Sequence, residues 1–219
     1  MKFCLILTLL ASVTLAPTIL AQEKNLEVEF RVTRFDPADG EPPTFEVGSA
    51  TKRVDVEIPL TSIAGPFKVR LRDGRFLDFW RGDGETPEIV LTITEAERKD
   101  LLLFFVPSGE SFKVIKVRTP ANAIGGGDRY LINACNSQIA IKAGKNESLY
   151  LDPGKGGVVR APSDGAATMP VLVSIKAAEK WKLATTETWY FDARFRKFLF
   201  AYPCPRTGQL CFHAVRERL

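Results

Sequence analysis

His213 is the only histidine in the 219-residue chain, and this limits the chemistry that the sequence can support. A Ser-His-acid triad would have to use it, yet the sequence holds no Gly-x-Ser-x-Gly turn to present a nucleophilic serine. A blue copper site needs two histidines, which the chain does not have. The sequence therefore predicts a protein without catalytic residues.

The cysteines Cys135, Cys204 and Cys211 form a Cys3His set with His213, and zinc accepts such a set when the ligands converge tetrahedrally. The paired short spacing of zinc sites is missing, however, and thiols of an exported chain tend to oxidise. We therefore predict no metal site and treat these four residues as an alternative only.

A disulfide between Cys204 and Cys211 is what we predict in place of a metal site. Both cysteines lie at the mouth of a short turn between two extended stretches, where directly opposed residues have the right separation for a bridge. This register would place Phe200 opposite Val215 and Tyr202 opposite His213. Cys135 lies in an apolar stretch, and we interpret it as a small buried residue.

Two clusters of aromatic and acidic residues are candidates for glycan binding, because sugar recognition uses aromatic platforms with polar neighbours. The other interpretation is that both tryptophans are large core side chains at strand ends. Nothing in the sequence fixes two carboxylates at the separation that glycoside hydrolysis needs. The first cluster is Trp80 with Asp78 and Asp83, and the second is Trp189 with Tyr190 and Asp192.

Two glycine-rich stretches, 125–127 and 154–157, lack the spacing of a phosphate-binding loop and are not followed by a helical pattern. We interpret both as turns or linkers, and the sequence predicts no cofactor.

The first 21 residues have the order of a secretory signal: basic Lys2, an apolar run, Pro17 and then the small Ala21. The alternative is a retained membrane anchor. Polar residues after Ala21 favour cleavage there, so we expect a secreted or periplasmic protein without a transmembrane segment.

The charge balance is mildly basic, with 30 Lys and Arg against 26 Asp and Glu. The basic residues are spread along the chain, which argues against a nucleic-acid partner. An envelope protein or a glycan is the kind of partner that we expect.

Short stretches of alternating apolar and polar residues, separated by Gly and Pro, predict an all-β protein built of small sandwiches that are Ig-like or barrel-like. The predicted organisation is a signal peptide at 1–21, a first unit at 22–118 with an extra N-terminal strand, a linker at 119–128 and a second unit at 129–219. We read 36–48 as a surface loop because of its prolines and glycines. Hairpins are expected at 101–117 and 198–216.

A shift of 72 residues superimposes several apolar positions of the two units, for example Leu77 on Leu149 and Phe79 on Leu151. The offset then grows to 82, and Pro107 resembles Pro203 at an offset of 96. The pattern predicts a duplication with an inserted pair of segments at 179–191. Period-two patterns also match by chance at every even offset.

The apolar residues before Asp192 and those after Lys197 fall on opposite faces of an extended chain. This change in buried parity predicts a break between Asp192 and Lys197.

These observations favour an exported, non-catalytic structural or interaction module of the cell envelope or extracellular space. The alternatives are a carbohydrate-binding module and a metal-binding or hydrolytic domain that uses the Cys/His group. Exposed coplanar aromatics would favour the first alternative, and convergence of Cys135 on Cys211 and His213 the second.

Overall fold

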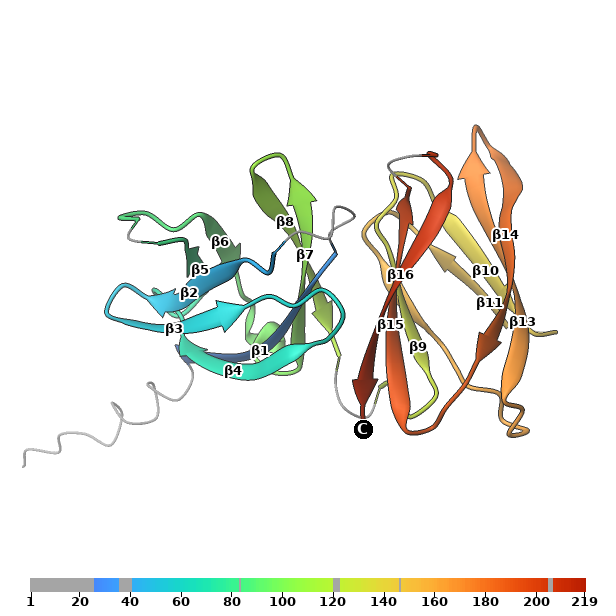
Figure 1. Ribbon diagram of the computed structural model, residues 1–219, viewed down its shortest axis with the longest axis horizontal. Helices are drawn as coiled ribbons and strands as arrows, with labels where there is room; N and C mark the ends of the chain where they lie inside the picture. The colour runs from blue at the N-terminus through green and yellow to red at the C-terminus, as the bar shows by residue number, and fades with distance from the viewer. Residues whose placement is uncertain (1–25, 36–40, 83, 120–122, 146, 205–206) are drawn as a thin grey trace, which may run out of the picture.

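The computed structural model describes residues 26–35, 41–82, 84–119, 123–145, 147–204 and 207–219. These residues form two β-sandwich units in tandem, with four four-stranded sheets (Figure 1). The predicted signal peptide at 1–21 lies outside the described residues. No helix in the described part of the chain has the length and apolar character needed to cross a membrane.

The first unit contains strands β1 to β8 and a short 3-10 turn, η2, at Glu95–Glu97. Its inner sheet, which faces the second unit, has the order β4-β1-β7-β8, and its outer sheet has the order β3-β2-β5-β6. The strands are β1 Glu27–Arg34, β2 Thr44–Ser49, β3 Lys52–Glu57, β4 Ala64–Arg70, β5 Phe76–Trp80, β6 Ile89–Thr92, β7 Leu101–Ser108 and β8 Ser111–Arg118.

The second unit contains strands β9 to β16, with an inner sheet β12-β9-β15-β16 and an outer sheet β11-β10-β13-β14. Figure 1 shows the outer sheet on the side away from the first unit. The strands are β9 Arg129–Asn133, β10 Ile139–Ala143, β11 Glu147–Leu151, β12 Gly156–Val159, β13 Thr168–Ala177, β14 Lys180–Tyr190, β15 Phe195–Pro203 and β16 Leu210–Arg218.

The two units have the same topology, because adding eight to each strand number of the first unit reproduces the sheet orders of the second. In both units the first and seventh strands pair in parallel, β1 with β7 and β9 with β15, and the other pairs of neighbouring strands in the sheets are antiparallel. The fold class predicted from the sequence is confirmed.

The residue-level alignment that the shift of 72 predicts from the sequence is wrong by two strands. A shift of 72 places β5 on β11, whereas the topology makes β13 the equivalent of β5. The supposed extra N-terminal strand, β1, has β9 as its counterpart, and the supposed insertion at 179–191 is β14, the counterpart of β6. Alternating patterns match at any even offset, so they cannot identify equivalent strands. Only the offset of 96, between Pro107 and Pro203, joins equivalent strands.

The stretch 36–48 was predicted as a loop, but it includes the start of β2. Phe45 and Val47 in this strand are fully buried and pair with β3 and β5.

Both predicted hairpins are confirmed as β7–β8 and β15–β16. The predicted break is also present, since β14 ends at Tyr190 and β15 begins at Phe195.

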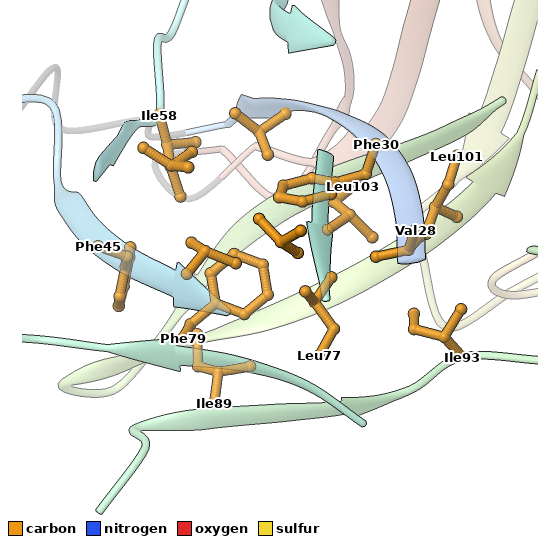
Figure 2. Packing of buried hydrophobic residues seen from close by; sticks show 14 of the residues in the cluster. Val28, Phe30, Phe45, Ile58, Leu77, Phe79, Ile89, Ile93, Leu101 and Leu103 are labelled. Atoms are coloured by element: carbon orange, nitrogen blue, oxygen red, sulfur yellow. The ribbon is translucent and has the colours of Figure 1, made fainter. Parts of the chain in front are cut away.

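Each unit has its own core between its two sheets. Figure 2 shows the first core, in which Phe30 of β1 lies close to Phe79 of β5 and Leu103 of β7 is part of the same cluster. A third cluster joins the two inner sheets. The unbroken apolar run of β7 follows from this arrangement: Leu101, Leu103 and Phe105 face the first core, and Leu102 and Phe104 face the second unit.

The predicted linker at 119–128 is packed against the second unit at its described residues. Ile124 is buried in the cluster between the inner sheets, and the backbone amide of Gly127 donates to the carbonyl of Phe195. The Asp128 carboxylate accepts hydrogen bonds from the amides of Gly125 and Ala161. Residues 120–122 lie outside the described part of the chain.

Candidate functional site

The two described residues of the first predicted aromatic cluster, Asp78 and Trp80, are buried beside arginine side chains. Trp80 is buried, and the guanidinium of Arg53 lies 3.9 Å from the centroid of its ring. Asp78 is fully buried and accepts hydrogen bonds of 2.6 and 3.0 Å from Arg72. Trp80 therefore does not offer an exposed platform, and Asp83 lies outside the described residues.

The second predicted cluster divides between core and surface. Trp189 is buried, and its indole N–H donates to the Glu187 carboxylate at 2.8 Å. Tyr190 is exposed, whereas Asp192 forms an ion pair with Arg194 at 2.7 Å. Hydrogen bonds from the Arg194 side chain and backbone lower the pKa of Asp192 to about 2. The aromatic side chains of this cluster do not share one exposed face.

The structure does not bring the Cys3His set together. Cys135 lies in the second core, where its thiol donates to the carbonyl of Ala201 at 3.6 Å and burial raises its pKa to about 11. His213 lies at the junction of the units, and its Nε2 is 3.0 Å from the carbonyl oxygen of Leu60. Among the described residues, no group of three or more His, Cys, Asp and Glu is placed to hold a metal ion.

The hairpin register differs by two residues from the predicted one. Tyr202 pairs with Cys211 and Phe200 with His213, so Cys204 and Cys211 are not directly opposed, and the structure has no disulfide between them. Burial, followed by a hydrogen bond with the thiol of Cys204, raises the pKa of Cys211. The two thiols are therefore in contact without a bridge.

A cleft of about 270 Å³ opens between β14 and β16 of the second unit and was not predicted from the sequence. It contains Trp189 and Tyr190 from the second predicted cluster, together with Arg129 of β9 and Lys197 of β15. The complete lining is Arg129, Glu187, Thr188, Trp189, Tyr190, Lys197, Leu199, Phe212 and Ala214.

Arg129 is an unusual residue for this position, because its side chain lies inside a sandwich and is only 6% exposed. The guanidinium lies 4.6 Å from the ring centroid of Trp189 and donates from Nη2 to the carbonyl of Tyr190 at 2.6 Å, while Nε has no hydrogen-bond partner. Burial lowers the pKa of Arg129 to about 10, so the group remains charged at neutral pH. A buried N–H group normally has a hydrogen-bond acceptor, so the unpaired Nε–H of Arg129 marks this position as a candidate binding site.

A second surface lies on the outer face of the outer sheet of the second unit, which we call the apolar groove. Tyr150 of β11 and Leu183 of β14 are 67% and 64% exposed there, and the groove has a volume of about 230 Å³. The rings of Tyr150 and Trp181 meet edge to face, with centroids 5.8 Å apart and planes at 61°. The lining is Ala140, Ile141, Lys142, Ser148, Tyr150, Leu172, Ser174, Trp181 and Leu183.

The apolar groove borders a free sheet edge. β14 is an 11-residue edge strand that pairs with β13 on one side and with no described strand on the other. The sequence carries a signal for this face: Tyr150 and Leu172 have the parity opposite to their buried neighbours Leu151 and Val171. Apolar residues at the outward positions of two strands indicate a covered or binding face.

Comparison with known proteins adds no functional assignment. No protein-family model matches the chain, and no curated protein matches it either.

Proposed function

We propose that this protein is an exported, non-catalytic interaction module of the cell envelope or extracellular space, and that the apolar groove beside the edge of β14 is its binding face. The observation that supports this proposal is the gathering of four large exposed side chains on one sheet face. Scattered exposed apolar residues are ordinary, whereas a contiguous patch marks an interaction site. The four are Tyr150, Leu172, Trp181 and Leu183.

The partner that fits this face is an extended acidic segment of another envelope protein. The open edge of β14 offers backbone donors and acceptors to an added strand, and Trp181 and Leu183 on the same strand offer contacts to its side chains. Lys142 lines the groove, and Lys180 and Lys182 are exposed on β14. These cations complement an acidic partner and also discourage pairing with a second copy of the same basic strand.

Carbohydrate binding is the second candidate, and Tyr150 and Trp181 are the residues that favour it. Their edge-to-face geometry does not form one flat platform, which is why a polypeptide partner is preferred. The separated Cys/His positions give no support to a metal-binding or hydrolytic function.

In-cell photo-crosslinking tests the proposal. A photoreactive residue at Thr186, an exposed position of β14, should crosslink the partner, which is then purified and titrated against the whole chain. Trp181→Ser and Leu183→Ser should each weaken binding about tenfold or more, because each removes a large apolar contact. Val90→Ser on β6 is the matched control, since Val90 is also an exposed apolar strand residue but lies in the first unit.

Three outcomes would contradict the proposed partner. Binding to an isolated neutral polysaccharide that Trp181→Ser abolishes would favour the carbohydrate alternative. Crosslinks only between copies of the chain would assign the face to self-association, and equal losses in Val90→Ser would show a nonspecific effect. Export is tested separately by N-terminal sequencing: a mature chain that begins at Gln22 supports it, and one that begins at Met1 contradicts it.

A further inference from the structure

The cleft of the second unit occupies a position that is solid core in the first unit. In the first unit, β1 and β7 pair in the register Phe30 with Leu101 and Val32 with Leu103. In the second unit, β9 and β15 pair in the register Arg129 with Lys197 and Leu131 with Leu199. The offset of 96 between β7 and β15 makes Lys197 the equivalent of Leu101, and the pairing then makes Arg129 the equivalent of Phe30.

The second unit therefore has two cations where the first has two buried apolar side chains. Phe30 and Leu101 are almost completely buried. Arg216 of β16 extends this pair to a row of three cations, because it pairs directly with Lys197. Like charges on directly neighbouring strands repel one another, and a half-buried position weakens the screening by water. Burial and then the charges of Arg129 and Arg216 lower the pKa of Lys197, opposed by Asp192.

The carboxylates near the row offset only part of its charge. Among the described residues that line the cleft, Glu187 is the carboxylate; its charge attracts Arg129, and it also accepts the hydrogen bond from Trp189. Asp192 near the entrance is paired with Arg194. The Arg129 Nε–H remains without an acceptor.

We propose that this cleft is a binding site for a small acidic ligand, whose carboxylate or sulfate group lies between Arg129 and Lys197. An anion there would offset the repulsion within the row, and the planar guanidinium is suited to a carboxylate or sulfate. A volume of about 270 Å³ accommodates a ligand near the small end of the usual range. This site shares no lining residue with the apolar groove and does not depend on the proposed function.

Titration of the whole chain with D-glucuronate, inorganic sulfate and D-glucose tests the site. Binding is followed by calorimetry and by the NMR signal of the Arg129 Nε–H, which should shift with glucuronate and not with glucose. Lys197→Gln should weaken anion binding about tenfold, the loss of one charge-assisted hydrogen bond. Lys113→Gln, at an exposed cation of β8 in the first unit, should leave it unchanged.

Lys197→Leu introduces the residue type that the first unit has at this position, Leu101. This variant should fold, so its anion binding can be measured. It should abolish anion binding and raise the melting temperature, because it removes like-charge repulsion. Arg129→Gln should abolish binding as well, and Lys197→Leu decides the question if Arg129→Gln does not fold. Sulfate that displaces glucuronate supports a site for the anionic group, and much tighter binding of glucuronate shows that the sugar ring also contributes. Wild-type affinity in Lys197→Leu, equal affinity for glucose and glucuronate, or no anion binding at millimolar concentration would overturn the proposal.

Discussion

Phe104 and Phe200 stack on one another across the junction of the two units, with ring centroids 3.2 Å apart and planes at 7°. They occupy equivalent positions of β7 and β15, so each unit contributes the same residue type from the same place in its inner sheet. The two units thus meet through equivalent faces, and the paired rings are part of a buried apolar cluster. The junction is a shared core rather than a flexible hinge.

Phe104→Ala and Phe200→Ala should each lower the free energy of unfolding by about 3–5 kcal/mol, because each leaves a cavity in this cluster. The double variant should lose less than the sum, since both single changes remove the same ring contact. Denaturant titration measures these values. Phe45→Ala with Phe200→Ala is the control pair and should be additive, because Phe45 lies in the first core. Full additivity of Phe104 and Phe200 would contradict the coupling.

Glu217 should make the junction sensitive to acid. Its carboxylate accepts hydrogen bonds from Arg196 of its own unit and from Arg31 of the first unit. Burial alone would raise the pKa of Glu217, but the hydrogen bond from Arg196 and the charges of Arg31 and Arg196 lower it overall. A lowered native pKa stabilises the fold above the unfolded-state pKa of about 4.3, and this contribution is lost as the pH falls through the native value.

Glu217→Gln should therefore cost about 2 kcal/mol of unfolding free energy at neutral pH, because it leaves buried Arg196 without a carboxylate. The difference between the variant and the wild type should shrink as the pH falls below about 4. Urea denaturation at a series of pH values measures it. A difference that stays constant down to the acid transition would show that the charge of Glu217 does not act at the junction.

Gly126 should tolerate no side chain, because a Cβ there would lie 2.0 Å from the carbonyl oxygen of Ala193. Gly126→Ala should lower the free energy of unfolding by about 1–3 kcal/mol, since backbone has to move. The adjacent Gly125→Ala is a matched control, because its Cβ would make ordinary contacts with Asp128 at 3.5 Å. Equal thermal stability of the two variants would mean that 123–128 is a loose linker after all.

Oxidation should distinguish the cysteines. The thiols of Cys204 and Cys211 are in contact, so we expect them to form a disulfide in exported protein, with a modest stabilisation of about 2 kcal/mol for so short a loop. Cys135 is buried and should react with a thiol reagent only after unfolding. Mass spectrometry of non-reduced protein measures both. Labelling of Cys204 and Cys211 in freshly isolated material would rule the bridge out.

The sequence alone determined the properties that depend on neighbouring residues. Alternation of apolar and polar residues identified an all-β chain, and the turn-rich gaps after Pro107 and Pro203 identified both hairpins. These inferences hold because strand period and turn chemistry are local.

Properties that depend on pairing between distant strands required the tertiary structure. The pattern was compatible with β5 matching β11, and only the sheet order identified β13 as its equivalent. Phe45 is buried in a stretch that reads as a loop, because its ring packs against Phe79 of β5 and Phe105 of β7. Arg129 and Lys197 are 68 positions apart in the chain, and they lie side by side only through the parallel pairing of β9 with β15. A repeating two-residue pattern carries no information about register, so the meeting of these two cations was decided by the fold.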